Sequence, residues 1–240
     1  MTVQLNEIYL NVPISQDEAK ESAYVCAARI LIADDHDIVR RGLRALVQEE
    51  PSWQVVADVQ DGRSAVVKTQ ELKPDVAILD IAMPSLNGLD ATKQIVKVNP
   101  DTKVLILTMH DSERLIQHVL NAGARGYLLK SDAGRDLVVA IRALLLGQTY
   151  FTQKVAQIVL DTFTGKKTTT TEGDIQSLTA KEREVVQLLA EGKSSKEAAD
   201  VLKVSTKTLE THRSNIMRKL GCHSVTDVVR YAIRNHLAQA

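Results

Sequence analysis

The sequence predicts two domains: an α/β domain with a doubly wound, five-stranded parallel sheet, followed by a smaller all-α domain of four helices. The first prediction rests on five short apolar runs that alternate with amphipathic stretches between residues 29 and 150. The second rests on four short amphipathic segments with helix-capping residues between residues 178 and 240. The chain has 240 residues, of which 44% are hydrophobic, and this is enough apolar material for two cores.

Strands and helices are expected to alternate along the first domain. The predicted strands are Ile30–Ala33, Val55–Val59, Val76–Leu79, Val104–Thr108 and Gly126–Leu129. The predicted helices are 37–49, 63–72, 89–98, 112–122 and 133–147. Near-continuous apolar strands are typical of parallel sheets that are buried on both faces, and right-handed crossovers then fix most of the topology.

The segments on either side of this domain are expected to lie outside its fold. Residues 1–28 show no clear periodicity and are predicted to be an N-terminal extension. Residues 151–177 are predicted to connect the domains, with an amphipathic helix over Thr152–Phe163 and then a linker over Thr164–Ser177. The threonine run, glycines and charges of that last segment are typical of a flexible linker.

Helix ends in the second domain are marked by capping residues. The capping boxes Thr179 with Glu182 and Ser194 with Glu197, the N-caps Ser205 and Ser224, and the helix-ending glycines Gly192 and Gly221 all follow this pattern.

The charge is unevenly distributed although the chain is neutral overall. Residues 1–177 carry a net charge of −4 and residues 178–240 a net charge of +4, which indicates that the second domain meets a polyanion. The two cysteines, Cys26 and Cys222, match no metal-ligand spacing and favour a reducing, cytoplasmic setting. No apolar run approaches the roughly 18 residues of a membrane span, so no membrane partner is expected.

Charged and polar residues stand at the carboxyl ends of the predicted strands, where parallel sheets place their functional sites. The residues at these ends are Asp34, Asp35, Asp80, Thr108 and Lys130. Clustered carboxylates repel one another and pair with a hard cation, so the arrangement predicts a Mg²⁺ site beside a carboxylate that can attack a phosphoryl group. The acidic pair alone could instead cap the following helix, but that reading does not explain residues at four strand ends.

The third helix of the second domain, residues 206–219, combines an apolar face with a polar, basic face of net charge +3. A short basic helix after a tight turn fits the major groove of double-stranded DNA, although an ordinary solvated helix can carry the same charge. Candidate phosphate contacts are Lys207, Arg213, Arg218 and Lys219. The other candidate DNA contacts are Thr208, Glu210, Thr211, Ser214 and Asn215.

Residues 29–147 resemble a receiver domain of the two-component response regulators, which have a flavodoxin-like fold. The match consists of Asp34, Asp35, the segment Asp80–Pro84, Gly88, Thr108, Tyr127 and Lys130. The resemblance implies that Asp80 accepts a phosphoryl group from a sensor histidine kinase. It also implies that Asp34, Asp35, Asp80 and the backbone carbonyl of Ala82 hold Mg²⁺, and that Thr108 and Tyr127 are a switch pair. Ser131 departs from the proline common in receivers, which puts a cis peptide there in doubt.

The second domain resembles the LuxR-type helix-turn-helix of the NarL/FixJ regulators. The matching segments are Leu178–Val185, Glu191–Ser194, Lys207–Arg213 and Asn215–Leu220. The resemblance implies that residues 206–219 are the recognition helix. It also implies that the last helix, 224–236, carries a homodimer contact through Val225, Val228 and Val229. Ser195, Ala198 and Lys203 depart from the family pattern, and Lys203 would be strained if its turn needs a positive φ.

The function expected from both domains is that of a phosphorylation-activated, DNA-binding transcription regulator rather than an enzyme. In a closed state we expect the first domain to cover the recognition helix, with the linker allowing release. An aspartyl-phosphate phosphatase is disfavoured because Ala82 stands two residues after Asp80, where a general acid would be needed. A regulator that binds a protein partner instead of DNA is the remaining alternative.

Overall fold

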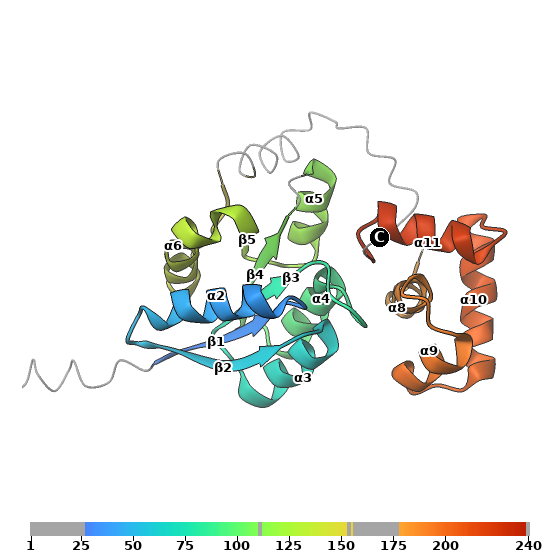
Figure 1. Ribbon diagram of the computed structural model, residues 1–240, viewed down its shortest axis with the longest axis horizontal. Coiled ribbons are helices and arrows are strands. Elements are labelled where there is room, and N and C mark those ends of the chain that lie inside the picture. Colours follow the sequence, from blue (N-terminus) through green and yellow to red (C-terminus); the bar gives the residue numbers. More distant parts are fainter. Residues whose placement is uncertain (1–26, 110–111, 153–154, 156–177, 239–240) are drawn as a thin grey trace, which may run out of the picture.

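The computed structural model describes residues 27–109, 112–152, 155 and 178–238. The first domain contains the strands β1 (Ala28–Ala33), β2 (Trp53–Val59), β3 (Val76–Asp80), β4 (Lys103–Thr108) and β5 (Gly126–Leu129). Its α-helices are α2 (Asp37–Gln48), α3 (Gly62–Leu72), α4 (Gly88–Val98), α5 (Glu113–Asn121) and α6 (Ala133–Leu145), and a short 3₁₀ turn, η2 (Lys130–Asp132), follows β5. The predicted alternation of five strands and five helices is confirmed (Figure 1).

The five strands form one parallel sheet in the order β2-β1-β3-β4-β5. The strand order reverses between β1 and β3, because the chain goes from β1 outward to β2 and then returns to the other side of β1. In open α/β sheets a ligand site forms at such a reversal, beyond the carboxyl ends of the strands. This edge carries the charged residues predicted from the sequence.

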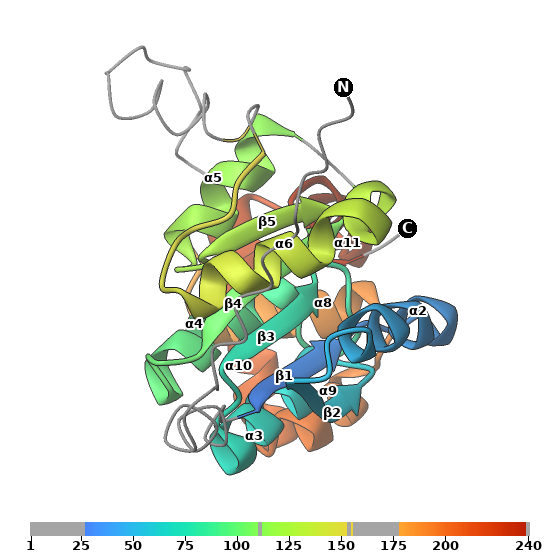
Figure 2. The ribbon, with the colours of Figure 1, turned by 90° about the vertical axis from the view of Figure 1, so that its left-hand side faces the viewer.

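Helices cover both faces of the sheet, as the doubly wound prediction requires. One hydrophobic layer joins Leu31 and Leu79 of the strands to α3, α4 and α5, and the other joins Ile32 and Ile78 to α2 and α6. Alternate strand residues enter opposite layers because side chains in a strand point to opposite faces. In Figure 2, α6 lies in front of the strands, on the face that it shares with α2.

The second domain consists of α8 (Ala180–Ala190), α9 (Ser195–Leu202), α10 (Thr206–Leu220) and α11 (Val225–Arg234), packed around one apolar cluster. Thr179 and Ser194 form the predicted capping boxes, and Ser205 and Ser224 are N-caps. Gly221 ends α10 with a φ of 63°, a left-handed conformation that glycine adopts without a Cβ penalty. The four predicted helices and their capping residues are therefore confirmed.

Two predicted segments lie largely outside the described residues. They are the N-terminal extension, of which residues 1–26 are not described, and the connecting segment, of which residues 153–154 and 156–177 are not described. The domain boundaries at residues 28, 150 and 177 therefore stay predictions. Across the part of the chain that is described, we find no helix with the length and hydropathy needed to span a bilayer.

Candidate functional site

The carboxyl ends of β1, β3 and β5 bring acidic side chains and a lysine together. Asp34 follows β1, Asp80 ends β3, and Lys130 follows β5. Lys130 Nζ lies 2.7 Å from Asp34 Oδ2 and 2.9 Å from Asp80 Oδ2, so it bridges the two carboxylates. Ligand atoms of Asp34, Asp35, His36 and Asp80 all lie within 4.8 Å of one another. Residues separated by nearly the whole first domain thus form one cluster.

Burial and charge repulsion shift the titration of this cluster. Asp34 and Asp80 are 0% and 3% exposed. The pKa of the Asp80 carboxyl lies above its ordinary value, mainly because the group is buried. The neighbouring carboxylates of Asp34 and Asp35 raise this pKa further, whereas the Lys130 cation lowers it. Burial lowers the pKa of Lys130, but the two carboxylates that it contacts raise this pKa more strongly. Lys130 therefore stays cationic at neutral pH beside an excess of acidic groups.

Two buried carboxylate oxygens in the cluster, Asp34 Oδ2 and Asp35 Oδ1, each have one close nitrogen neighbour among the described residues. Lys130 Nζ lies 2.7 Å from Asp34 Oδ2, and His36 Nδ1 lies 2.7 Å from Asp35 Oδ1. Several carboxylate oxygens that converge on one point are the kind of ligand set that a hard divalent cation takes. The residues present therefore fit Mg²⁺.

The predicted switch residues lie on β4 and β5, the two strands that follow β3 toward one edge of the sheet. Thr108 is one residue beyond Leu107, the register partner of Asp80 on β4. Tyr127 on β5 pairs with Ile106, two residues before Thr108, so Thr108 and Tyr127 point to the same face of the sheet. Both are buried, and Tyr127 packs in the layer formed by α3, α4 and α5.

The loop after Asp80 returns tightly to the end of β3. The Gly88 amide donates to Ile81 O at 2.8 Å, and a Cβ on Gly88 would lie 2.1 Å from the carbonyl oxygen of Asp80. Only glycine allows this approach. Ala82, whose carbonyl is a predicted ligand, lies in this loop. Within the described residues every peptide bond is trans, including the one at Ser131.

Sequence reasoning missed Arg40, which orders the first acidic pair. Arg40 is 5% exposed, donates to the backbone carbonyl of Asp34 at 2.8 Å and pairs with Asp58 at 2.7 Å. The sequence did indicate this buried position, because Arg40 stands at helical spacing from Leu43 and Val47 and shares their buried side of α2. A charged residue in an apolar stripe indicates a buried polar partner.

The predicted DNA-contacting face of α10 is largely open to solvent. Seven of the nine predicted residues are exposed: Lys207, Thr208, Glu210, Thr211, Ser214, Arg218 and Lys219. Arg213 and Asn215 are partly buried, while Leu209 and Ile216 face the domain core as predicted. The helix therefore has the apolar and polar sides that a recognition helix needs.

Two residues of this domain have roles that the sequence did not indicate. Lys219 Nζ donates to Glu182 at 2.7 Å, which ties α10 to α8. Val228 is 1% exposed and packs in the domain core, so it is not available for the dimer contact expected of it. Val225, by contrast, is exposed at the start of α11.

The expectation that the first domain covers the recognition helix is wrong for this arrangement. Helix α8, rather than α10, meets the first domain, and α8 lies between the sheet domain and α10 in Figure 1. The physical reason is that α8 presents polar groups that match those of the loop after β3 and of α4, whereas the exposed face of α10 points away.

The sheet topology, the lysine-bridged acidic cluster and the helical second domain define a receiver joined to a DNA-binding output domain. Residues 30–142 match the response regulator receiver domain, and residues 176–232 match the bacterial regulatory proteins of the luxR family. The oxygen regulatory protein NreC of Staphylococcus aureus is 40% identical over 215 residues, which cover 88% of this chain and 99% of NreC.

Solved structures give the same assignment. A LuxR-family two-component response regulator from Aurantimonas is 35% identical, with a TM-score of 0.54 over 57% of this chain and 99% of its own. Salmonella enterica RcsB, bound to the rprA promoter with the phosphomimetic BeF₃⁻, is 29% identical, with a TM-score of 0.55 over 85% of this chain and 97% of its own. The chain belongs to the two-component response regulators with a LuxR-type DNA-binding domain, and it is a phosphorylation-dependent transcription regulator.

Proposed function

We propose that Asp80 is the phosphoacceptor of this regulator, and that a sensor histidine kinase is the donor. The observation that carries this proposal is the bridging of Asp34 and Asp80 by Lys130, at 2.7 Å and 2.9 Å. In the transfer, an Asp80 carboxylate oxygen forms a bond to phosphorus as the bond from phosphorus to the donor breaks, and the donor keeps the electron pair. The product is an acyl phosphate on Asp80.

The residues around Asp80 have distinct roles in this transfer. Asp34, Asp35 and Asp80 would hold Mg²⁺ through their side chains, and Ala82 would do so through its carbonyl. When bound, the ion supplies positive charge that offsets the charge on the phosphoryl oxygens. The Lys130 ammonium offsets charge from the side of β5, and the Thr108 hydroxyl donates a hydrogen bond to the attached phosphoryl group. Tyr127 follows the movement of Thr108 as the second member of the switch pair.

In our proposal, Asp80 is the only group that is phosphorylated and dephosphorylated at this site. Transfer to Asp80 and hydrolysis of its acyl phosphate are self-catalysed, with no separate substrate turned over. Ala82 supports this view over a phosphatase, since it cannot protonate a leaving group at the position where phosphatases place an acid.

The decisive experiment is labelling with a radioactive small-molecule phosphodonor, such as acetyl phosphate, in the presence of Mg²⁺. Asp80→Asn should abolish incorporation, because an amide oxygen does not form a stable acyl phosphate. Asp101→Asn changes an exposed aspartate in the turn before β4 and should label like the wild type. Equal labelling of Asp80→Asn and the wild type would show that Asp80 is not the acceptor.

We further propose that the phosphorylated protein binds double-stranded DNA as a homodimer, in the cytoplasm where promoters are found. The exposed face of α10 enters the major groove, with Lys207, Arg213, Arg218 and Lys219 toward phosphates. Thr208, Glu210, Thr211, Ser214 and Asn215 lie along the base edges and the adjacent backbone. RcsB, a relative solved in complex with promoter DNA, supports this proposal. Val225 at the start of α11 is the exposed candidate for the dimer contact.

Salt-dependent binding to duplex DNA separates this proposal from a regulator that binds only protein. Removing one basic side chain that meets a phosphate should reduce the slope of log affinity against log salt by about 0.9. We therefore expect Arg218→Ala to flatten the slope by about this amount and to weaken binding to all sequences alike. Lys103→Ala, a half-buried basic residue at the start of β4, is the matched control and should leave the slope unchanged. A wild-type affinity that does not respond to salt would contradict DNA binding.

A further inference from the structure

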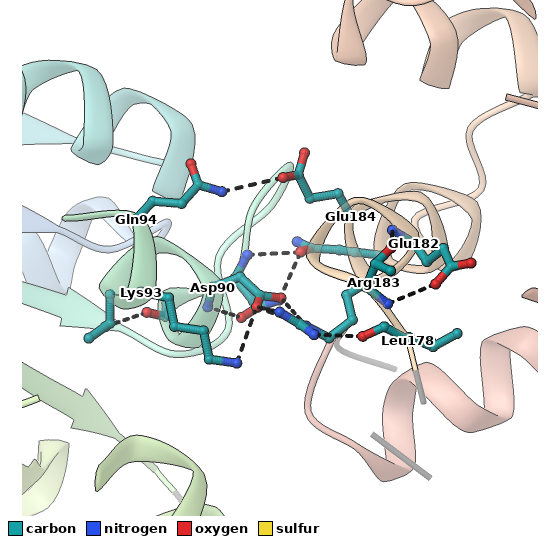
Figure 3. A network of polar contacts seen from close by, with 12 residues as sticks. Asp90, Lys93, Gln94, Leu178, Glu182, Arg183 and Glu184 are labelled. Atoms are coloured by element: carbon teal, nitrogen blue, oxygen red, sulfur yellow. Dashed lines mark hydrogen bonds and ion pairs between the residues drawn. The ribbon is translucent and has the colours of Figure 1, made fainter. Parts of the chain in front are cut away.

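One face of α8 is polar yet lies against the first domain. The contacting residues are Arg183, Glu184 and Gln187 of α8 and its C-cap residue Glu191. Gln187 is 0% exposed, and Arg183 and Glu184 are also buried. Figure 3 shows Arg183 and Glu184 pointing from α8 toward Asp90 and Gln94 of α4. Buried polar groups need partners, and here the other domain supplies them.

Two ion pairs between described residues join the domains, and the more buried of them joins Arg183 to Asp90. Arg183 Nε and Nη2 donate to Asp90 Oδ1 at 2.9 Å and 2.7 Å, and Arg183 Nη1 donates to the carbonyl of Leu178 at 3.0 Å. Glu184 adds contacts with Arg63 of α3 at 2.6 Å and with Gln94 at 3.3 Å. These side chains fix where α8 lies on the first domain.

With α8 in this position, Gln187 forms hydrogen bonds to the backbone of the loop after β3. Its Oε1 accepts from the Asn87 amide at 2.8 Å, and its Nε2 donates to the Met83 carbonyl at 2.9 Å. Next to it, Glu191 Oε1 accepts from the Ser85 amide at 2.8 Å. Three backbone groups of one five-residue loop are therefore held by α8.

This loop directly adjoins the acidic cluster. Asp80 ends β3, Ala82 is two residues further on, and the loop closes where Gly88 packs against the carbonyl of Asp80. Ser85 has a φ of 66°, which is unfavourable for a residue with a side chain, so the loop conformation needs support from outside. Helix α8 supplies that support through the Ser85 amide and through the residues on either side.

We infer that Gln187 is a positioning residue for the Mg²⁺ site, so that the docked DNA-binding domain preorganises the phosphorylation centre of the receiver. The inference rests on the proposed function. A loop held at residues 83, 85 and 87 keeps Ala82 in place, and a preformed ligand set binds its ion more tightly than a loose one. Because coupling between two sites is reciprocal, Mg²⁺ should in turn tighten the docking of α8.

Isothermal titration of the full-length, unphosphorylated protein with Mg²⁺ tests this inference. Gln187→Ala should weaken Mg²⁺ affinity by about fivefold or more, the lower end of typical coupling between sites. In the metal-free protein, hydrogen exchange at the amides of residues 83–87 should speed up in the same variant. Lys196→Ala, an exposed residue of α9, is the control and should match the wild type in both measurements.

An unchanged or tighter Mg²⁺ affinity in a folded Gln187→Ala protein overturns the inference. If that variant fails to fold, Glu191→Ala decides instead, because Glu191 is partly exposed at the end of α8 and holds only the Ser85 side of the loop. It should weaken Mg²⁺ affinity in the same direction, and an unchanged affinity again overturns the inference. Failure of the wild type to bind Mg²⁺ or to label at Asp80 would instead contradict the proposed function.

Discussion

At the scale of single residues, the acidic cluster is arranged for its ligand rather than for stability. Asp34 and Asp80 are buried and share the Lys130 cation, and burial and like charge together raise the pKa of Asp80 above its ordinary value of 3.8. An acid whose pKa is raised by folding makes the folded state less stable at any pH above that raised value. This cost disappears as the pH falls through the folded pKa toward 3.8.

We therefore expect Asp80→Asn to stabilise the metal-free protein at neutral pH, by an amount on the order of 1 kcal/mol, or a few degrees in Tm. The gain should shrink as the pH is lowered, because wild-type Asp80 then becomes protonated and neutral as well. Mg²⁺ should raise the Tm of the wild type more than that of the variant, since the variant lacks one of the ligands. Differential scanning calorimetry over a pH series, with and without Mg²⁺, measures all three effects. A variant less stable than the metal-free wild type at neutral pH would contradict this account of the cluster.

At the scale of elements, local sequence patterns predicted most of the fold. Strands, helices and caps could be predicted from the sequence because their patterns repeat every two to four residues. The acidic cluster could be predicted because parallel strands end at one edge of the sheet. The contacts of Arg183 and Gln187 with the other domain could not be predicted, because polar residues on a helix normally indicate a solvated face. Their partners lie about a hundred residues away in the other domain, and no local pattern encodes such a contact.

The turn between α9 and α10 has the positive φ on which the expected strain at Lys203 depended. Lys203 ends α9 in the left-handed conformation, with φ 54° and ψ 44°, where a Cβ is unfavourable and glycine is preferred. Lys203→Gly should therefore stabilise the second domain by up to about 1 kcal/mol. Urea unfolding of the full chain, followed by circular dichroism, measures the change.

The matched control for this prediction is Lys196→Gly within α9. There the backbone is helical, and glycine should destabilise the helix by about 1 kcal/mol. Opposite signs for the two lysine-to-glycine changes would identify the positive φ as the cause. If Lys203→Gly is as destabilising as Lys196→Gly, the left-handed conformation carries no cost at this turn.

At the scale of the whole molecule, the two domains meet through polar side chains while the candidate DNA-contacting face stays open. The arrangement differs from steric blocking of α10, because the receiver contacts α8 and holds it through Arg183 and Asp90. Regulation by this interface would thus act on the loop beside the phosphoacceptor and on the relative position of the domains.

The Arg183–Asp90 pair should decide whether the domains stay docked. Removing one partner of a buried ion pair leaves an uncompensated charge that costs about 3–5 kcal/mol if it stays buried. Arg183→Ala should therefore release α8 and let Asp90 become hydrated, which increases the radius of gyration of the full chain in small-angle X-ray scattering. Asp90→Ala should do the same, and the double variant should be no more extended than either single variant, because the ion pair is absent from all three. Arg41→Ala, an exposed arginine on α2, is the control. A radius of gyration that is unchanged in Arg183→Ala would show that the remaining contacts of Gln187 and Glu184 hold the domains together without this ion pair.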